Sequence, residues 1–202
     1  MIQSAPKSMR LQIAIFGKVN AGKSSFLNHI TNQQISITSP VAGTTTDAVE
    51  KAMELLPLGP VLFIDCAGYG DDTVLGAERM KKSDIAYSRA DIIVWVTAAA
   101  DFNDIDRRFL KKCAAEKRPV IVVVNKTDIT APTETLLAEI KSFGIDNILQ
   151  INSLSVADRE RHIAAFKLHI LCHAVKQCGF SCTVTSEDAI DFSFFKGIFC
   201  AF

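Results

Sequence analysis

Residues 17–24, GKVNAGKS, combine two glycines, a lysine and a serine in the pattern G-x-x-x-x-G-K-S/T. Gly17 and Gly22 permit the tight turns that aim backbone N–H groups at phosphate oxygens, and the N-terminus of a following helix assists them. Lys23 would bridge the β- and γ-phosphates as a point charge, and the Ser24 hydroxyl would ligate magnesium. The loop therefore predicts a nucleoside triphosphate site.

The segment NKTD, residues 125–128, follows an apolar run and indicates which base is bound. The Asp128 carboxylate can accept from both the N1 and N2 donors of guanine, whereas adenine offers no matching donor pair. Asn125 would hold the loop facing the base, and the Lys126 stem would lie over the purine plane. Asn and Asp also make ordinary turns, but together with the phosphate loop upstream these residues indicate GTP over ATP.

Two further segments carry groups suited to the metal and the terminal phosphate. In IDCAGYG, residues 64–70, Asp65 can reach magnesium through a water and the Gly68 amide can meet the γ-phosphate. In AGTTTD, residues 42–47, a threonine that binds the metal only with triphosphate present would make a switch. The position after Gly68 often carries a water-orienting glutamine. Here it is Tyr69, so we expect slow intrinsic turnover and expect Tyr69 to cover the site or meet a partner.

Alternating strand and helix patterns must position these groups. Apolar strands are predicted at 11–16, 49–57, 61–67, 91–97, 119–125 and 147–151, and helices after Lys23 and over about 75–89, 103–117, 132–143 and 156–175. The helix over 103–117 has Asp101 or Asn103 as its cap. The first two strands after the loop form a hairpin, because LGP at 58–60 is too short for a parallel crossover. The series predicts a doubly wound α/β domain whose ligands bind where strands end and helices begin.

Composition limits the class of protein. The chain has 202 residues, is 49% hydrophobic and carries 22 basic and 22 acidic side chains. It therefore has no basic surplus, which argues against nucleic acid or an anionic membrane as a partner. The first ten residues do not follow the pattern of a secretory signal peptide, and no run is long enough to span a bilayer. We expect a cytoplasmic protein.

Three regions differ in character: an N-terminal extension at 1–9, the nucleotide-binding domain at 10–175 and a hydrophobic C-terminal extension at 176–202. Six of the thirteen phenylalanines fall in the last region. Its role stays open between a segment packed on the core, which we favour, and an exposed patch for a partner or a missing domain.

The motifs over about residues 10–154 resemble translation-factor-class small GTPases, which implies a three-layer α/β/α P-loop GTPase fold of the Ras-like type. In that fold the six-stranded sheet is mostly parallel with one antiparallel strand. The segments NAGKS and GTTTD resemble the branch containing the tRNA-modification and ribosome-assembly GTPases. The run 53–82, with PLGPV and with Leu75, Gly76 and Arg79, resembles the GTPase domain of the di-iron hydrogenase maturation GTPase HydF.

This resemblance adds residue assignments. It places a magnesium ligand on Thr45 and a potassium ligand on Asn20, although Asn20 also suits a tight turn. The serine–alanine pair usual near the base is Ser153-Leu154 here, and the glutamate used by tRNA-modification relatives is not in register; Asp71, Asp72 and Glu78 are nearby candidates. The residues assigned to the nucleotide are Gly17, Asn20, Ala21, Gly22, Lys23, Ser24, Ser25, Thr44, Thr45, Asp65, Gly68, Asn125, Lys126, Asp128, Ser153 and Leu154, with Lys23, Thr45, Asp65 and Gly68 assigned to catalysis.

The resemblance implies hydrolysis of GTP to GDP and phosphate as a molecular switch in hydrogenase maturation, with magnesium and potassium as cofactors. The implied partners are GTP, a second copy of the chain, and hydrogenase or its other maturation proteins. The segment HILCH at 169–173 departs from the family's cluster-ligand pattern, so no iron–sulfur ligands are assigned. Two alternatives stay open: a GTPase of ribosome assembly or tRNA modification, and a nucleotide-binding scaffold or metal-cluster carrier with little hydrolysis.

Overall fold

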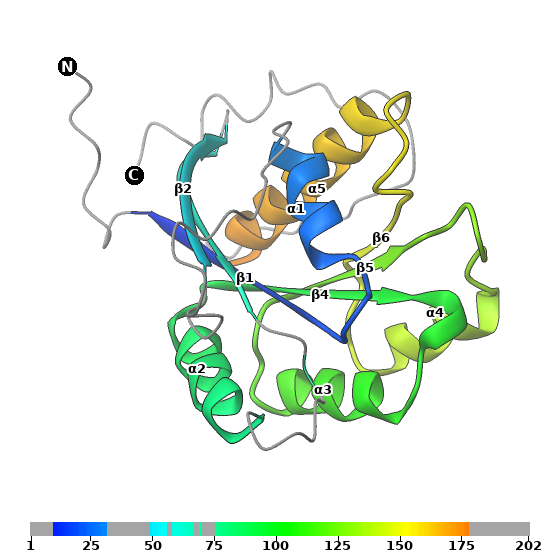
Figure 1. Ribbon diagram of the computed structural model, residues 1–202, viewed down its shortest axis with the longest axis horizontal. Coiled ribbons are helices and arrows are strands. Elements are labelled where there is room, and N and C mark those ends of the chain that lie inside the picture. The colour runs from blue at the N-terminus through cyan, green and yellow to red at the C-terminus, as the bar shows by residue number, and fades with distance from the viewer. Residues whose placement is uncertain (1–9, 32–48, 56–57, 67–68, 70–75, 178–202) are drawn as a thin grey trace.

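A computed structural model describes residues 10–31, 49–55, 58–66, 69 and 76–177, arranged as one sheet with helices on both sides (Figure 1). The strands are β1 (Leu11–Gly17), β2 (Val49–Leu55), β3 (Gly59–Asp65), β4 (Ile92–Ala98), β5 (Val120–Asn125) and β6 (Ile148–Gln150). The helices are α1 (Lys23–Thr31), α2 (Gly76–Arg89), α3 (Asp104–Ala115), α4 (Glu134–Ser142) and α5 (Arg159–Gln177), with a 3-10 turn, η2 (Ala99–Asp101), before α3.

The six strands lie in the order β2-β3-β1-β4-β5-β6. Strand β2 runs antiparallel to β3, and every other neighbouring pair is parallel. The expected hairpin is confirmed, but β3 begins at Gly59 rather than at residue 61. Gly59 has φ +84°, a conformation that glycine adopts without the strain of a side chain. The Leu58 N–H donates to the Leu55 oxygen across the turn at 2.7 Å. This arrangement is the mostly parallel six-stranded sheet that the pattern of apolar runs predicts.

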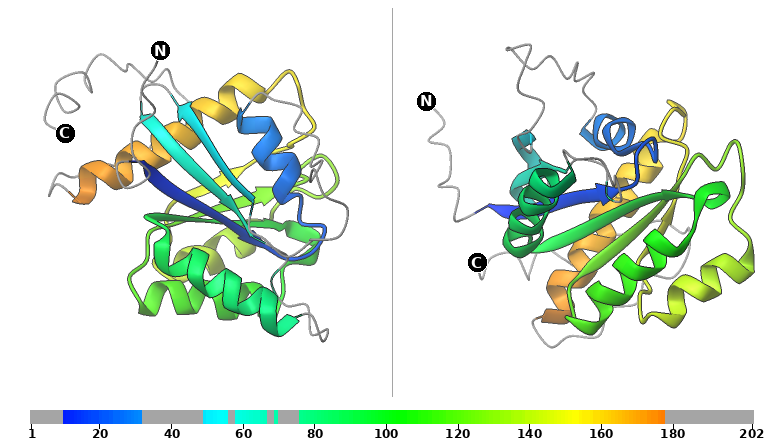
Figure 2. Two further views of the ribbon diagram at one scale, coloured as in Figure 1. Left: turned by 60° about the vertical axis from the view of Figure 1, so that its left-hand side comes forward. Right: turned by 60° about the horizontal axis from the view of Figure 1, so that its bottom comes forward.

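Apolar side chains alternate between the two faces of the sheet and bury a separate core on each. Ile13 and Ile15 join the core under α1 and α5, whereas Ala14 and Phe16 join the core under α2, α3 and α4. Figures 1 and 2 show these two helical layers on opposite sides of the sheet. Both faces are therefore covered, as a parallel sheet requires.

Strand β1 runs parallel to both β3 and β4, and β4 runs parallel to β5. The carboxyl ends of β1, β3 and β5 therefore lie at the same edge of the sheet. These strands end at Gly17, Asp65 and Asn125. The motifs that follow them are thus brought together at the edge where open α/β sheets bind ligands. Within the part of the chain that the structure describes, no helix combines the length and apolar character needed to cross a membrane.

Candidate functional site

The two glycines of the phosphate loop occupy positions that no other residue fits. Gly17 has φ +151°, and a Cβ there would lie 2.2 Å from the backbone oxygen of Val96. Gly22 has φ +95°, and a Cβ there would lie 2.3 Å from Nδ2 of Asn125. The loop is therefore pressed against β4 on one side and against the end of β5 on the other.

The middle of the loop is a tight turn that leads into α1. Asn20 is exposed and has φ +61°, a left-handed conformation that Asn tolerates better than most residues. The Ala21 N–H donates to the Lys18 oxygen at 3.3 Å. Ser24 and Ser25 are half-buried in the first turn of α1, whose N-terminal amides form an anion-binding end.

Lys23 folds back over the loop. Its Nζ donates to the backbone oxygens of Gly17 at 3.1 Å and Lys18 at 2.8 Å. Burial lowers the pKa of this ammonium, and the nearby Asp65 carboxylate partly offsets that effect. The lysine is thus a partly desolvated charge held at the loop by two carbonyl groups.

Asp65 ends β3 beside Lys23. Its Oδ1 is buried and makes no hydrogen bond to any part of the chain that the structure describes. Burial raises the pKa of Asp65, while Lys23 lowers it. A buried carboxylate oxygen without a protein donor suits a magnesium-bound water, so this residue and the Ser24 hydroxyl fit the expected metal site. The adjacent Cys66 thiol has its pKa raised to about 12, chiefly by burial, and so stays neutral.

Asn125 joins the phosphate loop to the last loop of the site. It is 2% exposed, and its Nδ2 donates to the Ala21 oxygen at 3.3 Å. Its Oδ1 accepts from the Ser153 N–H at 3.1 Å and from the Ser153 hydroxyl at 2.8 Å. One side chain therefore fixes three segments that lie far apart in the sequence.

The remaining base-loop residues line the same edge. Lys126 has φ +60° and is half-buried, and Asp128 is exposed. Ser153 is buried against Asn125, whereas the Leu154 side chain is 77% exposed. The structure thus leaves Asp128 and Lys126 accessible for a base, and it gives Ser153 a role in holding the loop.

Several expected site residues lie outside the described residues: Thr44, Thr45 and Gly68, together with Asp71 and Asp72. Their roles stay predictions. The side chain of Glu78, on α2, is likewise not described. In the described ranges, no three or more His, Cys, Asp or Glu side chains form a group that could hold a metal ion by themselves.

Tyr69 packs on α3 and β4, a placement that the sequence does not indicate. Its N–H donates to the Gly17 oxygen at 3.0 Å. Its ring meets Trp95 and Phe109 edge-on, with centroid separations of 5.9 and 5.0 Å. The backbone of Tyr69 therefore contacts the phosphate loop, while its half-buried ring packs against the aromatic core beneath α3.

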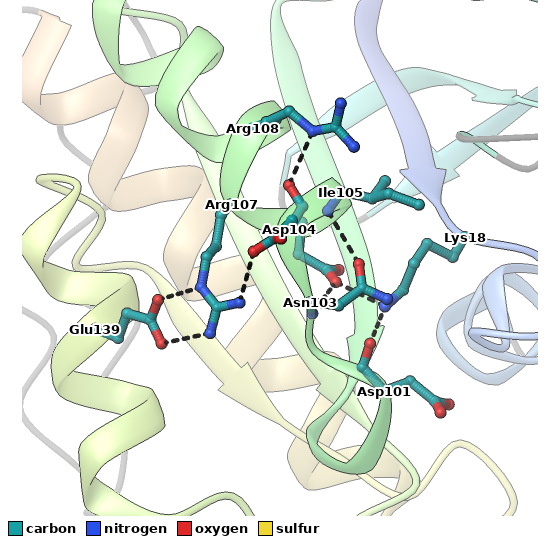
Figure 3. Close-up of polar contacts among 9 residues, drawn as sticks. Lys18, Asp101, Asn103, Asp104, Ile105, Arg107, Arg108 and Glu139 are labelled. Carbon is teal, nitrogen blue, oxygen red and sulfur yellow. Dashed lines mark hydrogen bonds and ion pairs between the residues drawn. The ribbon is translucent and has the colours of Figure 1, made fainter.

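Sequence reasoning also missed Lys18, the residue after Gly17. Figure 3 shows its ammonium among polar groups at the start of α3, near Asp101 and Asn103. Its Nζ lies 2.7 Å from Oδ2 of Asp106. Asp106 is the third residue of a helix capped by Asn103 and completes a capping box there. The Asn-x-x-Asp spacing of Asn103 and Asp106 could have indicated the capping box. No feature of the nearby sequence connects Asp106 with Lys18.

Comparisons with known proteins agree on one family. The model of the 50S ribosome-binding GTPase family matches residues 12–126. The tRNA modification GTPase MnmE of Lactobacillus johnsonii is 32% identical over an alignment of 186 residues, which covers 89% of this chain and 36% of that protein. The chain thus spans well under half the length of this relative.

Two solved structures of the GTPase Era are also similar. A variant from Aquifex aeolicus bound to GDP·AlF4⁻ has 27% identity and a TM-score of 0.62, covering 77% of this chain and 55% of that one. Era in complex with MgGDPNP and nucleotides 1506–1542 of 16S ribosomal RNA has 26% identity and a TM-score of 0.59, covering 89% and 59%. The RNA in that complex does not fit the expectation, drawn from the neutral net charge, against a nucleic-acid partner.

Proposed function

The chain belongs to the 50S ribosome-binding GTPase family, and we propose that it binds GTP at the edge formed by β1, β3 and β5 and hydrolyses it to GDP and phosphate as a molecular switch. The main observation behind this proposal is the Asn125 side chain, which hydrogen-bonds to Ala21 in the phosphate loop and to Ser153 in the last loop of the site. A nucleotide must contact both loops at once, and this bridge fixes the distance between them.

Within this proposal Lys23 exchanges its two carbonyl partners for the β- and γ-phosphates. The exchange is favourable because a phosphate carries full negative charge, whereas the oxygens of Gly17 and Lys18 carry only partial charge. The lowered pKa of Lys23 reflects burial that a bound phosphate would offset. Ser24 and Asp65, with Thr45, would hold magnesium, which supplies charge neutralisation on the phosphates. The Gly68 amide would meet the γ-phosphate.

Lys23→Ala tests the site. We expect at least about a hundredfold loss in kcat/KM for phosphate release from GTP, because the variant removes a charge that acts on the transition state. Lys141→Ala, which removes an exposed lysine from α4, is the matched control and should leave the rate unchanged. Equal activity of the two variants would refute the assignment. Multiple-turnover phosphate release in the parent also separates a GTPase from a scaffold that only binds nucleotide.

Asn20 carries the proposed potassium dependence. Its φ of +61° means that Asn20→Ala would strain the loop as well as remove the amide oxygen. Asn20→Gly removes the amide but tolerates that backbone conformation, and Asn20→Asp keeps an oxygen at the same position. We expect faster hydrolysis in potassium than in sodium at equal ionic strength for the parent and for Asn20→Asp, with the preference lost in Asn20→Gly. A parent without a cation preference would exclude this role.

For the cellular pathway we favour tRNA modification, which the name of the relative MnmE states, or ribosome assembly, which the ribosomal RNA bound in the Era complex supports. The second candidate is maturation of di-iron hydrogenase, which the likeness of residues 53–82 to HydF favours. Crosslinking of the GTP-bound and GDP-bound chain to cellular RNA at two salt concentrations distinguishes them. Salt-sensitive, nucleotide-dependent crosslinks support the first pathway. Capture of hydrogenase maturation proteins without RNA supports the second.

A further inference from the structure

A buried ion pair ties the phosphate loop to the start of α3 (Figure 3). Lys18 Nζ lies 2.7 Å from Oδ2 of Asp106 and also donates to the Asp101 backbone oxygen. The Asp106 side chain is fully buried and that of Lys18 is 12% exposed. A pair so removed from water holds its geometry, because separating it would leave an uncompensated charge in the interior.

The Asp106 carboxylate is fully engaged by α3 and β4. Its Oδ1 accepts from the Trp95 indole N–H at 2.9 Å, and its Oδ2 accepts from the Asn103 N–H at 2.8 Å. A displacement of Lys18 therefore changes the environment of the Trp95 indole through a single shared carboxylate.

A second path joins the loop to the same indole. The Tyr69 N–H donates to the oxygen of Gly17, and the Tyr69 ring meets both Trp95 and Phe109. Trp95 in turn stacks on Phe109 with a centroid separation of 4.1 Å. Consecutive loop residues, Gly17 and Lys18, thus reach Trp95 from two directions.

The main chain of Lys18 also responds to the proposed nucleotide. Its oxygen accepts a hydrogen bond from Lys23 Nζ at 2.8 Å, and this bond would be lost when the Lys23 ammonium binds the nucleotide's phosphates instead. We propose that Lys18 is a positioning residue that couples the nucleotide state of the loop to α3 through Asp106. This inference rests on the proposed GTP site and adds an output surface to it, the N-terminal end of α3.

The test uses Trp95, the single tryptophan of the chain, as an internal reporter. In the parent, GDP and a non-hydrolysable GTP analogue should each change Trp95 emission, and by different amounts. Lys18→Met should bind both nucleotides within about tenfold of the parent affinity by calorimetry, show a markedly smaller emission change than the parent, because only the path through Tyr69 remains, and show a lower kcat with little change in KM. Lys18→Arg should restore the response, because it keeps the cation. Lys111→Met, which removes an exposed lysine from α3, should behave like the parent.

Each outcome separates the alternatives. No calorimetric binding to the parent overturns the proposed GTP site. Binding without a change in Trp95 emission, or an unchanged response in Lys18→Met, overturns the coupling and leaves Lys18 as a structural ion pair. If Lys18→Met does not fold, the double variant Lys18→Met/Asp106→Asn, which leaves no unpaired charge, takes its place, and a response there as large as the parent's also overturns the coupling.

Discussion

Asn125→Ala should weaken both the fold and the nucleotide site. The Asn125 side chain is 2% exposed and makes three hydrogen bonds, one to Ala21 and two to Ser153. Alanine removes the donor to the phosphate loop and the acceptor for both polar groups of Ser153. Because Ser153 is 7% exposed, its N–H and hydroxyl would be left in the interior with little access to water.

The expected magnitude follows from these contacts. A hydrogen bond contributes about 1 kcal/mol net, and a buried group left without a partner costs about 1–3 kcal/mol. We therefore expect Asn125→Ala to lower the free energy of unfolding by about 3–5 kcal/mol, a large part of the about 5–15 kcal/mol typical of domains. If the substitution destabilises the nucleotide-bound state by at least about 1.4 kcal/mol more than the free folded state, the Kd for GDP rises at least about tenfold.

Urea unfolding and calorimetric GDP binding measure the two effects. Asn152→Ala is the matched control, because Asn152 neighbours Ser153 but its side chain makes one exposed hydrogen bond within the described residues, from the Leu154 N–H at 2.9 Å. It should lower the free energy of unfolding by less than about 1 kcal/mol. If the two variants agree within about 0.5 kcal/mol, the bridging role of Asn125 is refuted.

Two further predictions concern the loop and the helices behind it. Gly17→Ala places a Cβ 2.2 Å from the Val96 oxygen and should lower the free energy of unfolding by about 3 kcal/mol or more. The control Gly144→Ala has φ +77° and open space around the new Cβ, so backbone strain should lower its free energy of unfolding by only about 1–2 kcal/mol. Equal losses of the two variants in urea unfolding would contradict the clash. His162 is buried with Nδ1 3.0 Å from Nε2 of His29, and its pKa is lowered to about 4, first by burial and then by the charges of His29 and Arg161. Since the folded pKa lies below the unfolded value of about 6.5, the unfolded chain takes up the proton first, and stability should fall by about 2 kcal/mol from about pH 7 to about pH 5; a His162→Gln variant with the same pH slope would argue against this.

The fold could be predicted because its signals are local. The apolar run at 11–16 became β1 with one residue added, Gly17, since β-branched residues bounded by a glycine mark a buried strand. The sequence offered Asp101 and Asn103 as N-cap residues for α3, and Asn103 is the one whose side chain accepts a hydrogen bond from the helix. Helix α5 starts at Arg159 rather than 156, and Ser155 and Asp158 hydrogen-bond each other in the turn before it.

The candidate site was predictable only as far as motifs reach. Parallel strands bring their ends together, so Lys23 and Asp65 meet at one edge as expected. Side-chain pairs across long separations have no such rule: Lys18 meets Asp106 from 88 residues away, and His29 meets His162 from 133 residues away. Local sequence patterns do not tell which partner such a side chain finds.

The placement of Tyr69 bears on which group orients the water that attacks the γ-phosphate. Its ring is held against Trp95 and Phe109, and its N–H is held by Gly17. The half-buried Tyr69 ring packs against the core under α3, and a phenol lacks the carboxamide of a glutamine, so this residue replaces a glutamine in position but not in chemistry. Hydrolysis would then need its ordering and charge-neutralising groups from elsewhere, and among the described residues the exposed Asn20 turn offers a side-chain oxygen within the loop. The hydrolysis rate should therefore depend on the cation present, while the packing of Tyr69 ties the segment after β3 to the phosphate loop.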